Sequence, residues 1–174
     1  MNSVDSCRVL LLFVLCFPLL VTSAVLDDVC STTPFPDFCI ATLRPDYRVP
    51  YAQGPQFIGI LMLDMVDLNN QQVISNLKKL ADQAKDPADQ GALLTYASGY
   101  GTINNRLLPD ARAAFAAPTR EGNVAAFPPL VDAAHIVVTY SKWIKQLGPD
   151  LSAGSDFAFK GTMICASIAR SIIG

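Results

Sequence analysis

The fold of this chain begins with the stretch VCSTTPFPDFC, residues 29–39, in which two cysteines flank a proline-rich centre. Pro34 and Pro36 disfavour one continuous helix, because proline lacks an N–H donor and restricts the residue before it. We therefore predict two short helices, folded back on each other, over residues 27–43. Such a hairpin brings Cys30 beside Cys39, whereas one straight helix would hold their Cα atoms beyond the roughly 7 Å limit for a disulfide. We expect these two cysteines to be joined.

Upstream of this stretch, residues 1–24 have the layout of a secretory signal. Arg8 lies in a short polar start, residues 9–21 form an almost unbroken apolar run, and small residues precede the expected cleavage point after Ala24. A membrane anchor would need about 20 apolar residues, and this run is shorter. We therefore predict a signal peptide over 1–24 and one domain over 25–174, with no membrane attachment once the signal is removed.

The cysteine content is typical of a secreted chain. Of the 5 cysteines, Cys7 and Cys16 would leave with the signal. Cys30, Cys39 and Cys165 remain, so an oxidising secretory route leaves one disulfide and one free thiol. Cys165 lies among apolar residues of a predicted helix, and we interpret it as a small buried side chain rather than a reactive thiol.

The rest of the chain has the pattern of long amphipathic helices. Apolar residues recur three or four positions apart in four segments, which are separated by Pro- and Gly-rich breaks. These segments predict helices over 57–84, 93–114, 130–147 and 157–172. Alternating steps of three and four are typical of helices that pack at about 20°. The expected fold is all-α: an up-down-up-down four-helix bundle preceded by the N-terminal α-hairpin.

Several local features of these helices are expected from single residues. Small residues such as Gly99 would let a neighbouring helix approach closely, and Pro109 should kink the second long helix. We expect a polar turn at 118–123 and a loop at 152–155. The pair Pro128-Pro129 indicates either a bend or a helix start at Pro129, since proline suits the first turn.

The composition offers little for catalysis or nucleic-acid binding. The chain has 13 Lys and Arg against 15 Asp and Glu and shows no basic stripe, which argues against nucleic acid as a partner. His135 is the single histidine; Asp132 or Thr139 has the spacing to orient it, but we interpret it as an edge-of-core or surface residue. Asp64 and Asp67 share a helix face, which favours a solvated pair over a metal site. We therefore predict no enzyme activity, no cofactor and no metal.

These parts together resemble the plant pectin methylesterase inhibitors and invertase inhibitors over essentially the whole mature chain. Two cysteines with eight residues between them, directly after a signal and ahead of four helices, are close to the N-terminal pattern of that family. Residues 96–107 resemble its third-helix segment, with Tyr100 and Leu107, and residues 165–172 resemble its last helix. The resemblance implies a non-catalytic inhibitor that blocks the substrate cleft of a target enzyme through a helical face, in a 1:1 complex.

One departure from that family is its second disulfide, which joins the second and third bundle helices. Tyr96 stands where the first of those cysteines is expected, and Tyr140 or Ser141 stands where the second is. Because both cysteines are missing, neither thiol is stranded, and packing through Tyr96 and Tyr140 has to compensate. Cys165 then resembles the unpaired fifth cysteine of the family.

A second departure concerns the target. Invertase inhibitors of that family carry a Pro-Lys-Phe motif after a Gly-Asp turn, whereas here Gly122-Asn123 is followed by VAA and then Phe127. The lysine that would meet an acidic active site is absent, which favours pectin methylesterase over acid invertase as the target. A non-inhibitory secreted binding protein is the alternative of another class.

The same region supplies the predicted partner contacts, Asn123, Phe127 and Pro128. An apolar ring and a stiff backbone lie there beside a predicted loop, and a helix-start staple is the alternative interpretation. Secretion to the extracellular space or apoplast is expected, with the vacuole as the other destination.

Overall fold

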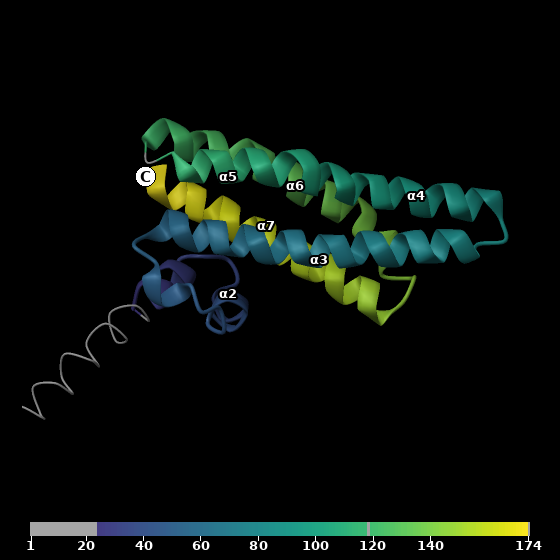
Figure 1. The fold of residues 1–174 in the computed structure, drawn as a ribbon, viewed down its shortest axis with the longest axis horizontal. Helices are drawn as coiled ribbons and strands as arrows, with labels where there is room; N and C mark the ends of the chain where they lie inside the picture. Colours follow the sequence, from purple (N-terminus) through teal and green to yellow (C-terminus); the bar gives the residue numbers. More distant parts are fainter. Residues whose placement is uncertain (1–23, 118, 174) are drawn as a thin grey trace, which may run out of the picture.

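The computed structural model describes residues 24–117 and 119–173, and every element in these two ranges is helical (Figure 1). The predicted all-α fold is therefore confirmed. The predicted signal peptide lies outside the described residues, apart from Ala24. The division of the chain into residues 1–24 and 25–174 stays a prediction.

The N-terminal hairpin consists of helical residues 24–31 and helix α2, Pro36–Leu43. A disulfide joins Cys30 and Cys39 across it, with 5.6 Å between the Cα atoms and both side chains fully buried. The Thr33 hydroxyl donates to the Cys30 carbonyl at 2.8 Å and closes the end of the first helical piece. The predicted hairpin and its pairing are both present.

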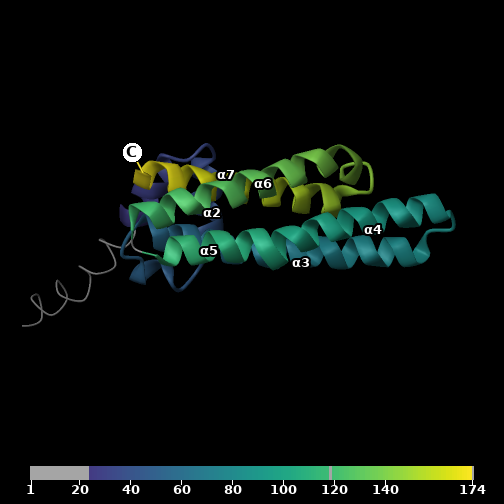
Figure 2. The ribbon, with the colours of Figure 1, turned by 90° about the horizontal axis from the view of Figure 1, so that it is seen from above.

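A short 3₁₀ turn, η1 Val49–Tyr51, follows the hairpin. Four long antiparallel helical elements come after it (Figures 1 and 2). They are α3 Pro55–Gln83, the run of α4 Pro87–Thr102, the π-helical turn η2 Ile103–Leu107 and α5 Leu108–Ala116, then α6 Arg120–Ile144 and α7 Pro149–Ile173. Because α4, η2 and α5 form one continuous run, the long elements alternate in direction. The predicted up-down-up-down four-helix bundle is confirmed.

The hairpin packs on α7 at one end of the bundle, where Figure 1 shows it beneath α3. Phe38 and Phe157 meet edge to face with 5.0 Å between ring centroids, and Phe35 meets Phe159 at 6.2 Å. Offset and edge-to-face aromatic pairs of this kind stabilise beyond the area they bury. The hairpin is therefore attached to the bundle by aromatic packing as well as by the chain itself.

Two glycines of α7 let that helix approach α3 closely. A methyl group placed on Gly154 would come 2.6 Å from Cγ2 of Val73, and one placed on Gly161 would overlap Cγ2 of Val66. The two glycines and the two valines are each seven residues apart, so the same contact repeats along the antiparallel pair. Close approach of α3 and α7 depends on the absence of side chains at these two positions.

The two tyrosines that the sequence resemblance placed at the positions of a second disulfide pack against each other. The rings of Tyr96 on α4 and Tyr140 on α6 have 5.1 Å between their centroids. A methyl group on Gly99 would overlap the Tyr140 ring, so this glycine makes the space that the ring fills. The expected aromatic contact and the expected close approach at Gly99 are both confirmed.

Pro109 lies two residues after the π-helical turn Ile103–Leu107, inside the continuous run of α4, η2 and α5. The structure thus adds a widened turn that the sequence did not predict. Periodicity in the sequence could not show this, because one extra residue in a turn changes the apolar spacing only slightly. The kink expected at Pro109 stays a prediction.

Helix α6 begins earlier than predicted. The Thr119 hydroxyl accepts a hydrogen bond from the Gly122 N–H at 3.0 Å and caps the helix, which starts at Arg120. The predicted polar turn at 118–123 is therefore wrong beyond Thr119. A helix start at Pro129 is wrong as well, because Pro128 and Pro129 lie inside α6.

Helix α7 also begins earlier than predicted. Gly148 makes the turn, with φ of 134°, a backbone conformation that favours glycine, and Pro149 opens the helix. The predicted loop at 152–155 is wrong: these residues are helical, and Gly154 among them serves the close packing against Val73 of α3. Asp156 consequently lies well inside α7, where it pairs with Lys160 at 2.8 Å.

Candidate functional site

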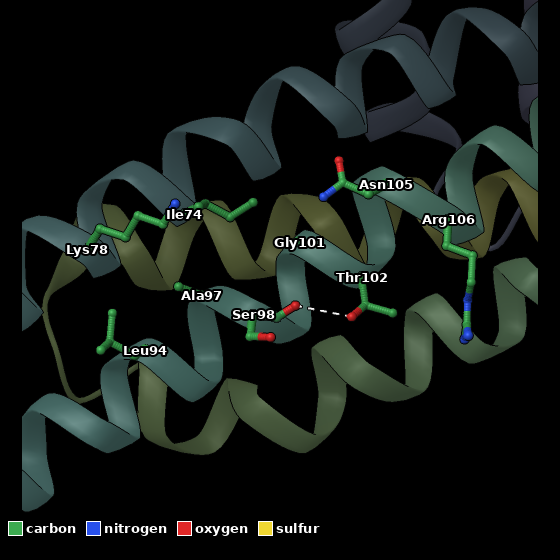
Figure 3. Close-up of a pocket in the computed structure, with 9 residues that line it drawn as sticks. All are labelled: Ile74, Lys78, Leu94, Ala97, Ser98, Gly101, Thr102, Asn105 and Arg106. Atoms are coloured by element: carbon green, nitrogen blue, oxygen red, sulfur yellow. Dashed lines mark hydrogen bonds between the residues drawn. The ribbon is translucent and has the colours of Figure 1, made fainter.

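A groove of about 650 Å³ lies between α3 and the α4–η2 run on the outside of the bundle (Figure 3). Its lining residues are Ile74, Lys78, Leu94, Ala97, Ser98, Gly101, Thr102, Asn105 and Arg106. Ala97 is buried and forms part of the floor, while Leu94 is an exposed apolar side chain at one end. Gly101 leaves the middle of the groove open, since a methyl group there would meet only Asn105 at 3.9 Å.

The groove is positively charged. Lys78 from α3 and Arg106 from η2 are the charged residues in its lining, and both are exposed. Neither takes part in an ion pair within the part of the chain that the structure describes. The remaining polar groups are hydroxyls and an amide, with the Thr102 hydroxyl donating to the Ser98 carbonyl at 3.2 Å. Such a lining suits docking of an acidic or polar surface.

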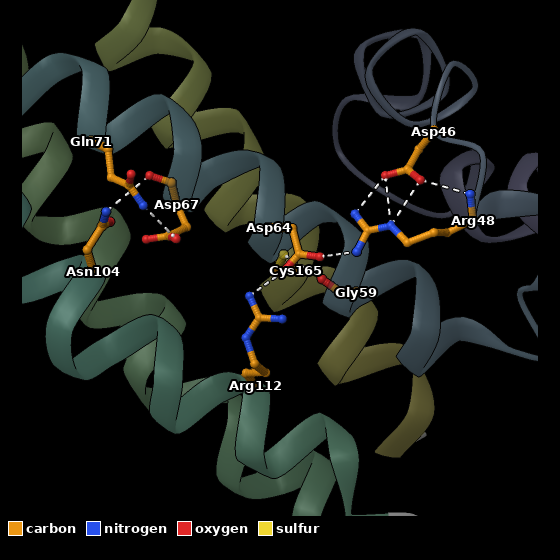
Figure 4. A network of polar contacts seen from close by, with 9 residues as sticks. All are labelled: Asp46, Arg48, Gly59, Asp64, Asp67, Gln71, Asn104, Arg112 and Cys165. Carbon is orange, nitrogen blue, oxygen red and sulfur yellow. Dashed lines mark hydrogen bonds and ion pairs between the residues drawn. The ribbon is translucent and has the colours of Figure 1, made fainter.

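A network of ion pairs ties the segment before α3 to the bundle (Figure 4). Arg48 donates to Asp46 at 2.7 Å and to Asp64 of α3 at 2.5 Å, and Arg112 of α5 pairs with the other oxygen of Asp64. Hydrogen bonds from Arg48 lower the pKa of Asp46, and the same bonds raise the pKa of Arg48. The network fixes three elements relative to one another.

Asp67 belongs to a separate network one turn along α3. Its backbone carbonyl accepts from Nδ2 of Asn104 at 3.1 Å, and its carboxylate accepts from Nε2 of Gln71 at 3.0 Å. Asn104 lies in the π-helical turn and also accepts from the buried Asn70 at 2.9 Å. Asp64 and Asp67 are thus held by different partners rather than forming one solvated pair. Among the residues described, no three His, Cys, Asp or Glu side chains gather as metal ligands do.

The structure places Cys165 in the core of the bundle. Its thiol is free and fully buried, and it lies 3.6 Å from the Gly59 carbonyl. Burial raises the pKa of this thiol, which keeps it protonated and unreactive. Its surroundings match the interpretation as a small core side chain.

His135 is exposed on α6. The Thr139 hydroxyl donates to the His135 backbone carbonyl at 2.8 Å, which is a local helix contact rather than a catalytic one. The location matches the interpretation of His135 as a surface residue.

The three predicted partner contacts do not share one surface. Asn123 is 2% exposed, and its Nδ2 donates to the Thr119 carbonyl at 2.9 Å inside the first turn of α6. Phe127 is half-buried against the core, whereas Pro128 is exposed. The helix turns Asn123 inward because the segment is not the loop that the sequence indicated. A partner contact through Pro128 stays a prediction.

A second groove was not expected from the sequence. It has about 640 Å³, lies at the far end of the bundle, and is lined by Leu80, Gln83, Ala84, Asp89, Ala92, Leu93, Tyr96, Trp143, Gln146 and Leu147. Trp143 is 54% exposed there, and it is the single tryptophan of the chain. Mostly apolar grooves of this size with a few polar groups are common small-molecule sites. The feature of the sequence that could have indicated this groove is Trp143, a single tryptophan near the end of a predicted helix.

The fold is shared with solved structures of known inhibitors. A mutant form of a pectin methylesterase inhibitor from Arabidopsis matches with a TM-score of 0.67 and 18% identity, over 82% of this chain and 93% of that one. A pectin methylesterase inhibitor from Arabidopsis thaliana matches with a TM-score of 0.61 and 18% identity, over 86% and 97%. No protein-family model and no curated protein sequence matches this chain. The chain therefore has the fold of the pectin methylesterase inhibitor structures.

Proposed function

We propose that this chain is a non-catalytic protein inhibitor of a secreted carbohydrate-active enzyme, with pectin methylesterase as its target, and that it belongs to the pectin methylesterase and invertase inhibitor family. The shared fold carries the proposal, because it extends over 93% and 97% of two inhibitor chains. The disulfide-closed hairpin at the N-terminus, joined through Cys30 and Cys39, supports it independently.

Acid invertase is the second target within this proposal, and the structure offers it less support. The region that would carry the Pro-Lys-Phe motif lies inside α6, has no lysine, and turns Asn123 into the core. Residues 122–128 contain no lysine or arginine that could meet an acidic active site as the lysine of that motif would.

The groove between α3 and α4 is the proposed face for the target. Lys78 and Arg106 give it two exposed positive charges, which would meet an acidic surface around a substrate cleft. A helical face of this kind blocks a cleft sterically, and one such face per chain implies a 1:1 complex.

The proposal includes secretion. A disulfide persists in oxidising compartments, so the Cys30–Cys39 bond supports export to the extracellular space or apoplast, or to the vacuole. We propose that residues 1–24 are removed on the way and that residues 25–174 form the mature domain.

The test is a titration of pectin methylesterase and of acid invertase with the secreted protein. Pectin methylesterase activity is expected to fall linearly to an endpoint at one equivalent, while invertase activity stays unchanged. Loss of neither activity at micromolar excess would refute the inhibitor proposal, and loss of invertase activity alone would move the target to that enzyme.

Charge reversal in the groove tests the face. The double substitution Lys78→Glu and Arg106→Glu should weaken inhibition about tenfold or more, because it replaces attraction by repulsion. Lys79→Glu is the matched control, since Lys79 is an exposed lysine next along α3 but lies outside this groove. Equal inhibition by the double variant and the control would exclude this face.

A secreted binding protein for a small apolar ligand is the second candidate function, and the groove at Trp143 favours it. Because Trp143 is the single tryptophan, its fluorescence reports on this groove alone. Titration with the apolar dye anilinonaphthalene sulfonate should quench that fluorescence in the folded protein. If Trp143→Ala binds the dye with the same affinity as the parent protein, measured from the emission of the dye, then the groove is not the dye site.

A further inference from the structure

The outward face of α6 carries a stripe of exposed residues whose order is nearly symmetrical about its centre. Figure 2 shows α6 in the outer layer of the bundle, beside the α4–α5 run. The residues that form the stripe, all of them exposed, are Glu121, Val124, Pro128, Val131, His135, Val138 and Lys142. An acidic residue begins the stripe, a basic residue ends it, and three valines at equal spacing lie between.

The valines make this face apolar. Val124, Val131 and Val138 are 47%, 43% and 52% exposed, and their seven-residue spacing places them on one line along the helix. One 18-residue stretch of α6 has a mean hydropathy of 1.2, so the helix is long and apolar enough to cross a membrane by length and composition alone. Only 28% of that stretch is buried inside the bundle, so much of its apolar surface is exposed. Single exposed apolar residues are ordinary, but three aligned on one helix face, separated only by Pro128 and His135, are typical of an interaction surface.

We propose that α6 packs antiparallel against α6 of a second copy of this chain, with the two-fold axis at Val131. In such an isologous contact, the pairing of residues is reciprocal. Val131 meets Val131 of the second copy, Val124 meets Val138, and Glu121 meets Lys142. In each pair the two residue numbers add up to 262 or 263, so a single two-fold axis generates all three contacts.

The charges at the two ends favour the antiparallel arrangement. Glu121 lies near the N-terminus of α6 and Lys142 in its last turn, so reversal of the second helix brings opposite charges together at both ends of the contact. The helix dipoles are also opposed in this arrangement. Two residues oppose the arrangement. Arg120, exposed at the first position of α6, also comes near Lys142 of the second copy, where Glu121 lies between the two positive charges. Asp132 is exposed beside the stripe, and the axis brings it near its own copy at the solvated rim.

Pro128 and His135 would form a further reciprocal contact between the two copies. Proline has no N–H, so Pro128 leaves the Val124 carbonyl without its helical donor on the outward face. The axis places His135 of the second copy opposite Pro128. Its ring N–H can donate to that carbonyl, which gives the exposed histidine a partner.

A second copy fits this face better than an anionic lipid surface. Helices that lie on such surfaces carry Lys and Arg along their polar face, whereas this stripe has an acid at one end and Asp132 beside its centre. The mixed charge matches a surface with the same residues in reverse order, which is what a second copy presents.

The test is sedimentation equilibrium of the secreted protein between about 5 and about 500 µM, a range suited to a contact as small as one helix pair. The weight-average mass is expected to rise from that of one chain toward that of two. Val131→Glu should keep the protein monomeric throughout, because it places two like charges on the axis. Leu68→Glu is the matched control: Leu68 is 61% exposed on α3, away from the stripe, and its variant should still dimerise.

Charge reversal gives a test that a folding defect cannot imitate. Glu121→Lys and Lys142→Glu should each weaken the dimer about threefold to tenfold, and the double variant should restore it. Within one copy the two residues are 21 positions apart, or about 31 Å along the helix, so restoration requires contact between copies. Asp132→Asn should strengthen the dimer.

Three outcomes would overturn the proposal: a monomeric protein over the whole range, a dimer that Val131→Glu leaves intact, or no restoration in the double variant. A monomer whose Val131→Glu variant loses inhibition of pectin methylesterase would assign the stripe to that enzyme instead. The dimer does not depend on the proposed function and is measured without any enzyme.

Discussion

Replacement of Gly161 by alanine should destabilise the bundle, although alanine is the better helix former. In a helix interior the change gains about 1 kcal/mol from backbone propensity. The added methyl group, however, would overlap Cγ2 of Val66, a fully buried side chain of α3 that cannot move into solvent. Overpacking of a tight core costs about 1–3 kcal/mol. Because the methyl group would overlap a buried atom, the cost should lie in the upper part of this range, about 2–3 kcal/mol, which leaves a net loss of about 1–2 kcal/mol.

The same substitution at Gly91 should have the opposite sign. Gly91 lies in α4, is exposed, and has nothing within 4 Å of the position a methyl group would take. Alanine there should stabilise by about 0.5–1 kcal/mol. The two variants share their chemistry and differ in the space that receives the methyl group, so Gly91→Ala is the control for Gly161→Ala.

Urea unfolding followed by circular dichroism measures both effects. For a domain of this size, 1 kcal/mol corresponds to about 2–4 °C in Tm, which gives a second readout. Combining Gly161→Ala with Val66→Ala should cost less than the sum of the two single changes, because the truncated valine makes room for the methyl group. A Gly161→Ala variant as stable as the parent, or additive costs in the double variant, would refute the close approach of α3 and α7.

Three further predictions concern polar and covalent contacts. Tyr100 is fully buried, and burial raises its pKa to about 12. The free energy of unfolding should therefore be unaffected below a pH of about 10 and should fall as the pH rises from there toward 12. Unfolding titrations of Tyr100→Phe should lack this alkaline loss. Asp64→Asn leaves two arginines facing a neutral amide at a 21% exposed site, and chemical denaturation should show a loss of about 1–3 kcal/mol. Joint replacement of Cys30 and Cys39 by serine should cost about 2–3 kcal/mol in urea unfolding, the value for closing so short a loop; an unchanged midpoint would mean that the hairpin unfolds independently of the bundle.

The arrangement of long helices could be predicted because it depends on apolar spacing that the sequence displays directly. Runs such as 57–84 bury one stripe each, and a stripe at helical spacing allows few other packings. The pairing of Cys30 with Cys39 followed from the prolines between them. The contact between Tyr96 and Tyr140 followed from the family resemblance, which implies a second disulfide at these positions.

The helix boundaries that were missed depend on interactions between distant segments. Gly154 looks like a loop residue by composition, and only the position of α3 shows that it is a packing residue inside α7. Asn123 looks like a turn residue, but the Thr119 cap turns it into the core. Pro128 breaks most helices, and here tertiary packing on both sides of α6 outweighs its cost.

The candidate site was beyond prediction for a similar reason. Lys78 and Arg106 belong to different helices, and no spacing in the sequence relates them. They share one groove only because the bundle sets α3 beside η2. A search for catalytic motifs could not find a site that consists of surface charge and shape.

The docking of the hairpin on α7 has a consequence for the chain during its synthesis. The hairpin is made early, and its cysteines, 9 positions apart, can pair as soon as both are exposed to an oxidising lumen. Its partners on α7, among them Phe159 and the Ser167 hydroxyl that donates to the Thr32 carbonyl, are translated about 120 residues later. At the usual rate of translation this delay is on the order of 6–25 s. Throughout that interval the α7 partner of Phe35 has not been made, so the hairpin is translated before the bundle but docks on it only after α7.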